Sequence, residues 1–227
     1  MDLKIKDIAD LLKVNEKTVH LWIKEKKIPF HNINHQYRFN RAEINEWILS
    51  HNDEFSSSLI NLGMTGRYSL TLLLEKGGIA YDIPGSGVKE VLKNAVTKIL
   101  APANLSTEEI LAALLNREDL MSTAIGKGIA LPHPRNPIVT NPDNASVAIC
   151  YLHTPISFGA LDGEPVHTLF ILLTASPKMH LEVLSRISYL CQDEKFLKLL
   201  KERKGKDTIL NLVKFKELEW STMETGK

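Results

Sequence analysis

The chain has 227 residues, of which 44% are hydrophobic and 24% are charged, and its formal net charge is +1. These ordinary globular values exclude wholesale disorder, and a net charge near zero gives no whole-chain argument for nucleic-acid binding. The sequence does not begin with an apolar leader, and no run reaches the roughly 18 apolar residues of a membrane span. The two cysteines are far apart in the sequence, which favours reduced thiols over a disulfide framework. We therefore expect a cytoplasmic protein without membrane insertion.

Residues 1–50 are predicted to form three short helices with a β-hairpin between the second and the third. Apolar residues recur at helical spacing in the first two helices, and Asn15 is placed to cap the start of the second. Residues 31–40 alternate loosely around a turn at Asn34-His35, which is typical of a hairpin. Residues 42–50 then close the unit as a helix. Its inward face carries Ile44, Trp47 and Ile48.

Residues 51–66 lose this periodicity and are rich in polar residues, which predicts a linker. From Arg67 onward the pattern becomes mixed. An amphipathic helix is predicted over residues 88–100, and Ser106 opens a capping box that starts another helix. A boundary at residue 220 would leave residues 221–227 as a tail.

Two apolar runs, residues 146–152 and 168–174, are typical of buried strands, and further helical periods follow residue 181. Helices interleaved with buried strands predict a layered α/β domain over residues 67–220. The fold class is therefore α/β, preceded by a small unit of three helices and a hairpin.

The segment from Arg117 to His133 carries residues suited to phosphate chemistry. A neutral imidazole nitrogen is nucleophilic and titrates near neutral pH, so His133 can carry a phosphoryl group. Such a site also needs positive charge and hydrogen-bond donors, which Arg117, Ser122 and Thr123 can supply. From these residue types alone, a structural histidine in a loop beside a strand end is the favoured interpretation, because His, Ser, Thr and Arg are common neighbours.

The string Arg-Glu-x-x-x-Ser-Thr-x-Ile-Gly-x-Gly-Ile-Ala-x-Pro-His, which ends at His133, resembles the signature of the fructose/mannitol/nitrogen class of phosphotransferase-system enzyme IIA domains. The resemblance extends over residues 67–220. Residues 154–158 and 162–166 resemble the family's run between two strands, and His180 resembles the second histidine of its site. The resemblance implies a mixed β-sheet flanked by helices.

The same resemblance implies the roles of individual residues. His133 would accept a phosphoryl group from the histidine-phosphocarrier protein, and His180 would stabilise the phosphorylated state. Arg117, Ser122 and Thr123 would line the site. Where the family often has Gly or Ala after the active histidine, this chain has Pro134 and Arg135, a change that can alter the partner surface while leaving the nucleophile intact.

Residues 6–23 resemble the helix-turn-helix of the excisionase/MerR-like family, and residues 27–30, 37–39 and 43–48 resemble its wing and closing helix. The resemblance implies that the second helix lies in the major groove of DNA. The outward residues that would reach bases or phosphates are Lys17, Thr18, His20 and Lys24. On the wing, Arg38, with His35 and Gln36, would contact the backbone or the minor groove.

The charge of this unit is weak support for DNA binding, because nine Lys or Arg against seven Asp or Glu give 9 − 7 = +2 over residues 1–50. A helix-turn-helix retained as a protein-interaction module is the alternative. Trp22 and Trp47 lie on apolar faces, so we expect them in the core rather than as stacking platforms.

The IIA-like domain and the helix-turn-helix unit together suggest three functions. The first is a DNA-binding transcription regulator whose IIA-like domain senses phosphotransferase state through phosphorylation of His133. The second is a phosphocarrier enzyme IIA that passes phosphate to a sugar transporter component, and the third is a regulator whose IIA domain binds partners without turnover. An enzyme IIB or a regulatory protein is a candidate target, and helix-turn-helix proteins often form homodimers on paired half-sites.

We expect no metal or other cofactor, because no His, Cys or carboxylate pair has ligand spacing, and His153 and His167 match no motif.

Overall fold

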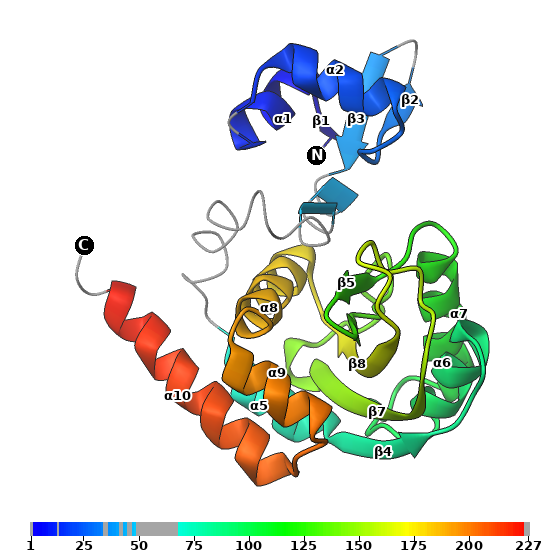
Figure 1. Ribbon diagram of the computed structural model, residues 1–227, viewed down its shortest axis with the longest axis vertical. Coiled ribbons are helices and arrows are strands. Elements are labelled where there is room, and N and C mark those ends of the chain that lie inside the picture. Colours follow the sequence, from blue (N-terminus) through cyan, green and yellow to red (C-terminus); the bar gives the residue numbers. More distant parts are fainter. Residues whose placement is uncertain are drawn as a thin grey trace.

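The computed structural model describes residues 2–12, 14–33, 36–40, 43–44, 47–48 and 68–224. Figure 1 shows a small N-terminal unit beside a larger α/β domain. The turn expected at Asn34-His35 and the linker expected over residues 51–66 lie outside the described residues.

The N-terminal unit begins with a short strand and two helices, β1 (Asp2–Leu3), α1 (Ile5–Leu12) and α2 (Glu16–Lys24), followed by a hairpin of β2 (His31–Ile33) and β3 (Gln36–Asn40). The three strands pair antiparallel in the order β1-β3-β2. The side chain of Asn15 accepts a hydrogen bond from the Thr18 amide at 2.8 Å, which confirms the predicted cap of α2. Residues 43–44 and 47–48, within the predicted closing helix, are helical.

The core of this unit is built from the apolar faces of these elements. Trp47 is buried, and its ring lies 5.4 Å from that of Trp22, centroid to centroid, so both tryptophans belong to the core as expected. The Trp47 indole N–H donates to the Lys27 carbonyl oxygen, which satisfies its buried donor. The buried apolar residues are Ile8, Ala9, Leu12, Val19, Ile23, Ile28, Phe39, Ile44, Trp47 and Ile48.

The larger domain is organised on a five-stranded mixed sheet of order β4-β7-β8-β6-β5. β4 runs parallel to β7, β7 antiparallel to β8, β6 parallel to β8, and β5 antiparallel to β6. The strands are β4 (Ile79–Ile83), β5 (Ala124–Gly126), β6 (Ile129–Ala130), β7 (Ser146–Ile156) and β8 (Val166–Leu173). A short 3-10 helix, η1 (Pro142–Asn144), precedes β7.

Helices cover both faces of this sheet (Figure 1). The alternating residues of β7 divide between two apolar clusters, Val147 and Ile149 in one and Ala148 and Cys150 in the other, as strand geometry requires. One face packs against α5 (Leu70–Gly77), α8 (Pro177–Leu190), α9 (Glu194–Lys201) and α10 (Lys206–Glu224), and the other against α6 (Val88–Val96) and α7 (Thr107–Glu118). The predicted mixed sheet flanked by helices is confirmed.

Two predicted helices differ in detail from the structure. The helix predicted over residues 88–100 ends at Val96, because the amides of Lys98 and Ile99 both bond to the Ala95 carbonyl oxygen and tighten the turn. Leu100 is consequently 63% exposed although it fits the apolar period. The capping box at Ser106 is confirmed, with reciprocal hydrogen bonds to Glu109. The helix α10 runs to Glu224, so the boundary expected at residue 220 lies inside it.

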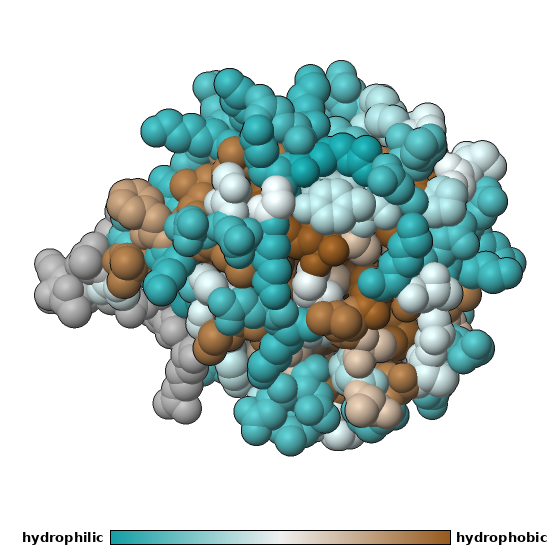
Figure 2. All heavy atoms as spheres, turned by 90° about the horizontal axis from the view of Figure 1, so that it is seen from below, coloured by the Kyte–Doolittle hydropathy of each residue, from teal (hydrophilic) through white to brown (hydrophobic). Residues whose placement is uncertain are grey.

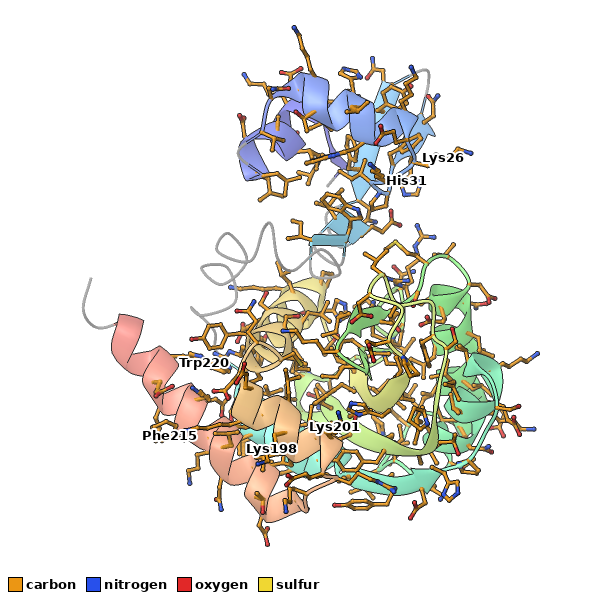
Figure 3. All side chains as sticks on the ribbon, viewed as in Figure 1. Lys26, His31, Lys198, Lys201, Phe215 and Trp220 are labelled. Atoms are coloured by element: carbon orange, nitrogen blue, oxygen red, sulfur yellow. The ribbon has the colours of Figure 1, made fainter. Side chains whose placement is uncertain are left out.

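A partly buried ionic network ties α5 to α10 and α8. The Glu217 carboxylate accepts hydrogen bonds from the Ser69 and Thr71 hydroxyls at 3.0 and 2.6 Å and from amides of the first turn of α5. Arg186 of α8 pairs with Glu217 at 3.3 Å, and its guanidinium lies over the Trp220 ring. Figure 3 labels Trp220 on α10. A carboxylate at a helix N-terminus is favourable because it satisfies donors that have no partner within the helix.

The surface remote from the N-terminal unit is mostly polar, with apolar atoms visible between hydrophilic side chains (Figure 2). In the described part of the chain, no helix is long and apolar enough to cross a bilayer.

Candidate functional site

The hairpin of β5 and β6 and the neighbouring β8 place His133. β6 pairs in parallel with β8, and the Leu172 amide continues the pairing by donating to the Pro132 carbonyl oxygen at 3.0 Å. His133 therefore follows the carboxyl end of β6, where open α/β sheets commonly carry their sites. The hairpin turn needs Gly128, which has a φ of +73° and whose missing Cβ would lie 2.4 Å from the His167 ring.

The ring of His133 is fixed in one tautomer. Its Nδ1 lies 2.6 Å from the Leu131 carbonyl oxygen. A carbonyl oxygen can only accept, so Nδ1 carries the proton, and in the neutral ring Nε2 then holds the lone pair. The side chain is buried, with 2% of its surface exposed. In this arrangement Nδ1 is engaged by the main chain, and Nε2 is the other ring nitrogen.

His180 lies against His133, although 46 residues lie between them in the sequence. The two ring centroids are 4.5 Å apart with planes inclined by 51°. His180 is in the first turns of α8, and its Nδ1 lies 3.3 Å from the Thr174 hydroxyl oxygen. The fold thus brings together the two histidines that the sequence resemblance pairs.

Arg117 lies in the last turn of α7, and Ser122 and Thr123 lie on the connection between α7 and β5. Arg117 is 4% exposed and donates to the Met121 carbonyl oxygen at 2.7 Å. The Thr123 carbonyl oxygen accepts from the Leu131 amide at 3.0 Å, which ties the connection to the strand before His133. The Ser122 hydroxyl donates to the Phe158 carbonyl oxygen and the Thr123 hydroxyl to Glu118, so both hydroxyls already serve protein acceptors.

Glu118 is a member of this cluster to which sequence reasoning assigned no role. Its carboxylate accepts from the Thr123 amide at 2.9 Å and from the Thr123 hydroxyl at 2.6 Å. Burial raises the pKa of the Glu118 carboxyl above its ordinary value, against the opposing effects of the Thr123 hydrogen bonds and the charge of Arg117. Its place in the motif string, at the end of a helix and five residues before Thr123, was the available signal.

The other histidines of this domain lie elsewhere. His153 is exposed and lies 3.6 Å from Asp82. His167 is half-buried, with Nδ1 2.8 Å from the Thr168 hydroxyl oxygen, and burial lowers its pKa with a further contribution from Lys201. Among the described residues, no three His, Cys, Asp or Glu side chains gather as a metal site requires.

The residues expected to contact DNA lie on α2 and β3. Lys17, His20 and Lys24 are exposed on α2, which lies on the side of the N-terminal unit away from the α/β domain (Figure 1). The Thr18 hydroxyl donates to the Asn15 side chain at 3.0 Å and so contributes to the helix cap. The Arg38 guanidinium is held by the Gln36 side chain and the Tyr37 carbonyl oxygen, while His35 lies outside the described residues.

Two family profiles match the chain. The profile described as "Phosphoenolpyruvate-dependent sugar phosphotransferase system, EIIA 2" matches residues 72–216, and one described as "Helix-turn-helix domain" matches residues 3–52. The first match covers more than half of the chain. The chain therefore belongs to the EIIA 2 family of the phosphotransferase system and carries a helix-turn-helix domain before its IIA domain.

Individual relatives agree with this assignment. The "PTS system fructose-specific EIIABC component" of Bacillus subtilis is 33% identical over 147 residues, which are 63% of this chain and 23% of that protein. The "Nitrogen regulatory protein" of Pseudomonas aeruginosa is 38% identical over 52% of this chain and 77% of its own length. Among solved structures, the nitrogen regulatory protein IIA-Ntr of Neisseria meningitidis has a TM-score of 0.56 at 28% identity, over 63% of this chain and 97% of that one. The chain thus spans less than a quarter of the Bacillus relative.

Proposed function

We propose that the chain is a DNA-binding transcription regulator whose IIA domain accepts a phosphoryl group on His133 from the histidine-phosphocarrier protein. The observation that carries the proposal is the geometry of the histidine pair. The His133 ring, held by the Leu131 carbonyl oxygen, has Nε2 as its basic nitrogen, and the His180 ring lies 4.5 Å away. In this proposal the protein is cytoplasmic, as its two cysteines led us to expect.

The proposed chemistry is a direct transfer between two histidines. The His133 Nε2 lone pair attacks the phosphorus of the donor's phosphohistidine, and the N–P bond of the donor breaks as the new N–P bond forms. The donor leaves with a neutral imidazole ring. Nδ1 of His133 keeps its proton and its hydrogen bond to Leu131 throughout, so the ring need not turn.

The charge that arrives with the phosphoryl group, about −1.5 to −2 near neutral pH, needs compensation. Arg117 is buried beside the site, and α8 directs its positive N-terminal end to the same region, where His180 lies. These features favour the phosphorylated state electrostatically. The Ser122 and Thr123 hydroxyls, which already donate to protein acceptors, act in this proposal chiefly by fixing the walls of the site.

The DNA-binding half of the proposal rests on α2. Lys17, His20 and Lys24 are exposed on one helix whose N-terminus is capped by Asn15, and the β2–β3 hairpin lies beside it. A second helix presented in this way is the groove-reading element of helix-turn-helix proteins. Arg38 on β3 can reach the backbone after releasing Gln36.

The second candidate function is a phosphocarrier that passes phosphate to a sugar transporter component. The similarity to a protein named as a fructose-specific EIIABC component favours it. Transfer from phosphorylated His133 to an enzyme IIB protein would mark this function. Retention of phosphate in the presence of candidate IIB proteins, together with DNA binding, would mark the regulator.

The direct test is phosphorylation of the full chain. With labelled phosphoenolpyruvate and the general phosphotransferase proteins, we expect one acid-labile phosphohistidine that is lost in His133→Ala and retained in the exposed control His153→Ala. Label that survives in His133→Ala would move the site to another residue. No label with any cognate donor would contradict both the regulator and the carrier functions and leave the domain as a binding module.

A further inference from the structure

The burial of His133 raises a question of access, if His133 is the acceptor as proposed above. A donor protein must bring its own phosphohistidine within bonding distance of Nε2. The His133 ring is 2% exposed in the full chain, with its Nδ1 edge held by Leu131 and its face against His180. Something that covers the ring must therefore move before the donor can react.

The N-terminal unit makes a direct contact with the segment that follows His133. Arg135 Nη2 lies 3.0 Å from the Glu43 Oε1 atom, and the other oxygen of Glu43 lies 2.7 Å from His31 Nε2. The Glu43 side chain is 18% exposed and that of Arg135 46%. Figure 3 labels His31 on the edge of the N-terminal unit nearer the IIA domain. The two units also share one continuous cluster of buried apolar side chains.

A cavity of about 410 Å³ lies at the same seam. Its wall on the IIA side includes Arg117, at the end of α7, and Arg135, on the segment that follows His133. That wall therefore includes one residue of the proposed phosphate site, Arg117, and the residue two positions after His133, Arg135. The remaining IIA residues of the lining are Leu120 and Met121, and the N-terminal unit contributes residues 26–31, Asn40 and Glu43.

We propose that the N-terminal unit docks on the face through which the phosphoryl donor must reach His133, so that docking and phosphorylation exclude each other. The Glu43–Arg135 ion pair holds the docked state. A phosphoryl group on His133 places negative charge two residues from Arg135 and competes with Glu43 for its guanidinium. The phosphorylated chain is then held with its DNA-binding unit released, and the proposal gives the IIA domain a means of signalling to that unit.

The docked state must be weak enough to open. An ion pair with one half-exposed partner contributes little, because solvent screens it, and its loss changes an equilibrium about two- to fivefold. The docked and released states therefore exchange, and a donor captures the released one. The exposed face of α2 stays open in the docked state (Figure 1), so docking constrains the orientation of the reading helix rather than covering it.

A charge-swap experiment on the full chain tests this inference. The variants are Glu43→Arg, Arg135→Glu and the double variant, with Glu43→Gln as a milder change that preserves the shape of the side chain. Nitroxide labels on Glu16→Cys and Lys89→Cys, both exposed, report the distance between the units, since Cys150 and Cys191 are buried. We expect each single variant to lengthen and broaden the distance distribution and the double variant to restore the original one.

Phosphorylation rate is the second readout. Glu43→Arg and Glu43→Gln are expected to raise the initial rate of transfer from the phosphorylated histidine-phosphocarrier protein about two- to fivefold, while the exposed control Glu202→Arg leaves it unchanged. An unchanged distance in Glu43→Arg, or a changed distance with an unchanged rate, would overturn the inference alone. Absence of phosphorylation in every variant, the natural sequence included, would overturn the proposed function and the competition with it.

Discussion

Glu118 shows how burial changes the pKa of a carboxyl group in the residue cluster near His133. Desolvation raises its pKa, whereas the amide and hydroxyl of Thr123 stabilise the ionised form less strongly. Its ionisation state therefore influences both stability and the charge around His133.

This gives a pH-dependent stability prediction. The pKa of Glu118 is higher in the folded chain than in the unfolded chain, where it has its ordinary value of 4.5. At pH values between these two pKa values the folded chain binds more protons than the unfolded chain. The free energy of unfolding therefore falls as the pH rises from 4.5 through the pKa of the folded chain. Glu118→Gln should remove that fall, as measured by urea unfolding over a series of pH values that rises from 4.5.

Glu109→Gln is the matched control for this series. The Ser106 amide lowers the pKa of Glu109, so its contribution to stability is lost as pH falls, and the two substitutions should change the pH dependence in opposite directions. Parallel profiles for Glu118→Gln and the natural sequence would show that Glu118 is solvated in the folded chain.

The histidine pair could be predicted from the sequence at the residue scale, and its geometry could not. The long motif string identified His133, and the resemblance supplied His180. The tautomer of His133 depends on the Leu131 carbonyl oxygen, whose direction is set by the pairing of β6 with β8. Likewise, Glu43 and Arg135 are 92 residues apart in sequence, and no local pattern predicts that they meet.

At the scale of elements, Glu217 joins three helices. It caps α5 through Ser69 and Thr71 and pairs with Arg186 of α8. Glu217→Ala leaves the first turn of α5 without its acceptor and Arg186 without a partially buried partner, so we expect a loss of about 2–4 kcal/mol in the free energy of unfolding. Chemical denaturation of Glu217→Ala and of the natural sequence measures this difference in the free energy of unfolding.

Glu202→Ala provides the comparison for Glu217→Ala. Glu202 is exposed and pairs with Lys198 and Lys204 on the surface, and such pairs contribute about 0–1 kcal/mol. Equal losses from the two substitutions would show that the Glu217 network has no special role in holding α5.

The helix α2 carries the prediction for DNA binding. If Lys17 and Arg38 contact phosphates, each alanine substitution should weaken binding to the chain's own upstream DNA and reduce the slope of log affinity against log salt by about 1. Lys198→Ala, a charge-matched change on α9 far from α2 (Figure 3), should leave the slope unchanged. Salt-independent binding, or equal slopes in all variants, would favour a protein-interaction module.

Prediction succeeded for elements with strong periodic patterns and failed for short ones. The apolar period predicted α6, and the Ser106 box predicted the start of α7. β6 has two residues and β5 three, too few for alternation to be recognised, and the pairing of β6 with β8 is set by tertiary contacts. The end of α6 at Val96 was missed because the closing turn competes with an apolar pattern that continues to Leu100.

At the scale of the whole molecule, two units with different chemistry are joined in one chain. The IIA domain buries His133 beyond the carboxyl end of β6, and the N-terminal unit presents the exposed Lys17 and Lys24 on α2. The two units contact each other through Glu43 and Arg135, and Arg135 is two residues after His133. In the proposed function, a phosphoryl group on His133 would act near this contact, and its charge would bias how the units are arranged.

The central claim is that phosphorylation of His133 controls DNA binding, and the most direct test compares DNA affinity in the two states. The full chain would be phosphorylated to completion, and its affinity for its own upstream DNA measured beside the unphosphorylated chain at fixed salt. We predict affinities that differ several-fold, with His133→Ala insensitive to the donor system. Equal affinities for the phosphorylated and unphosphorylated chain would contradict the account.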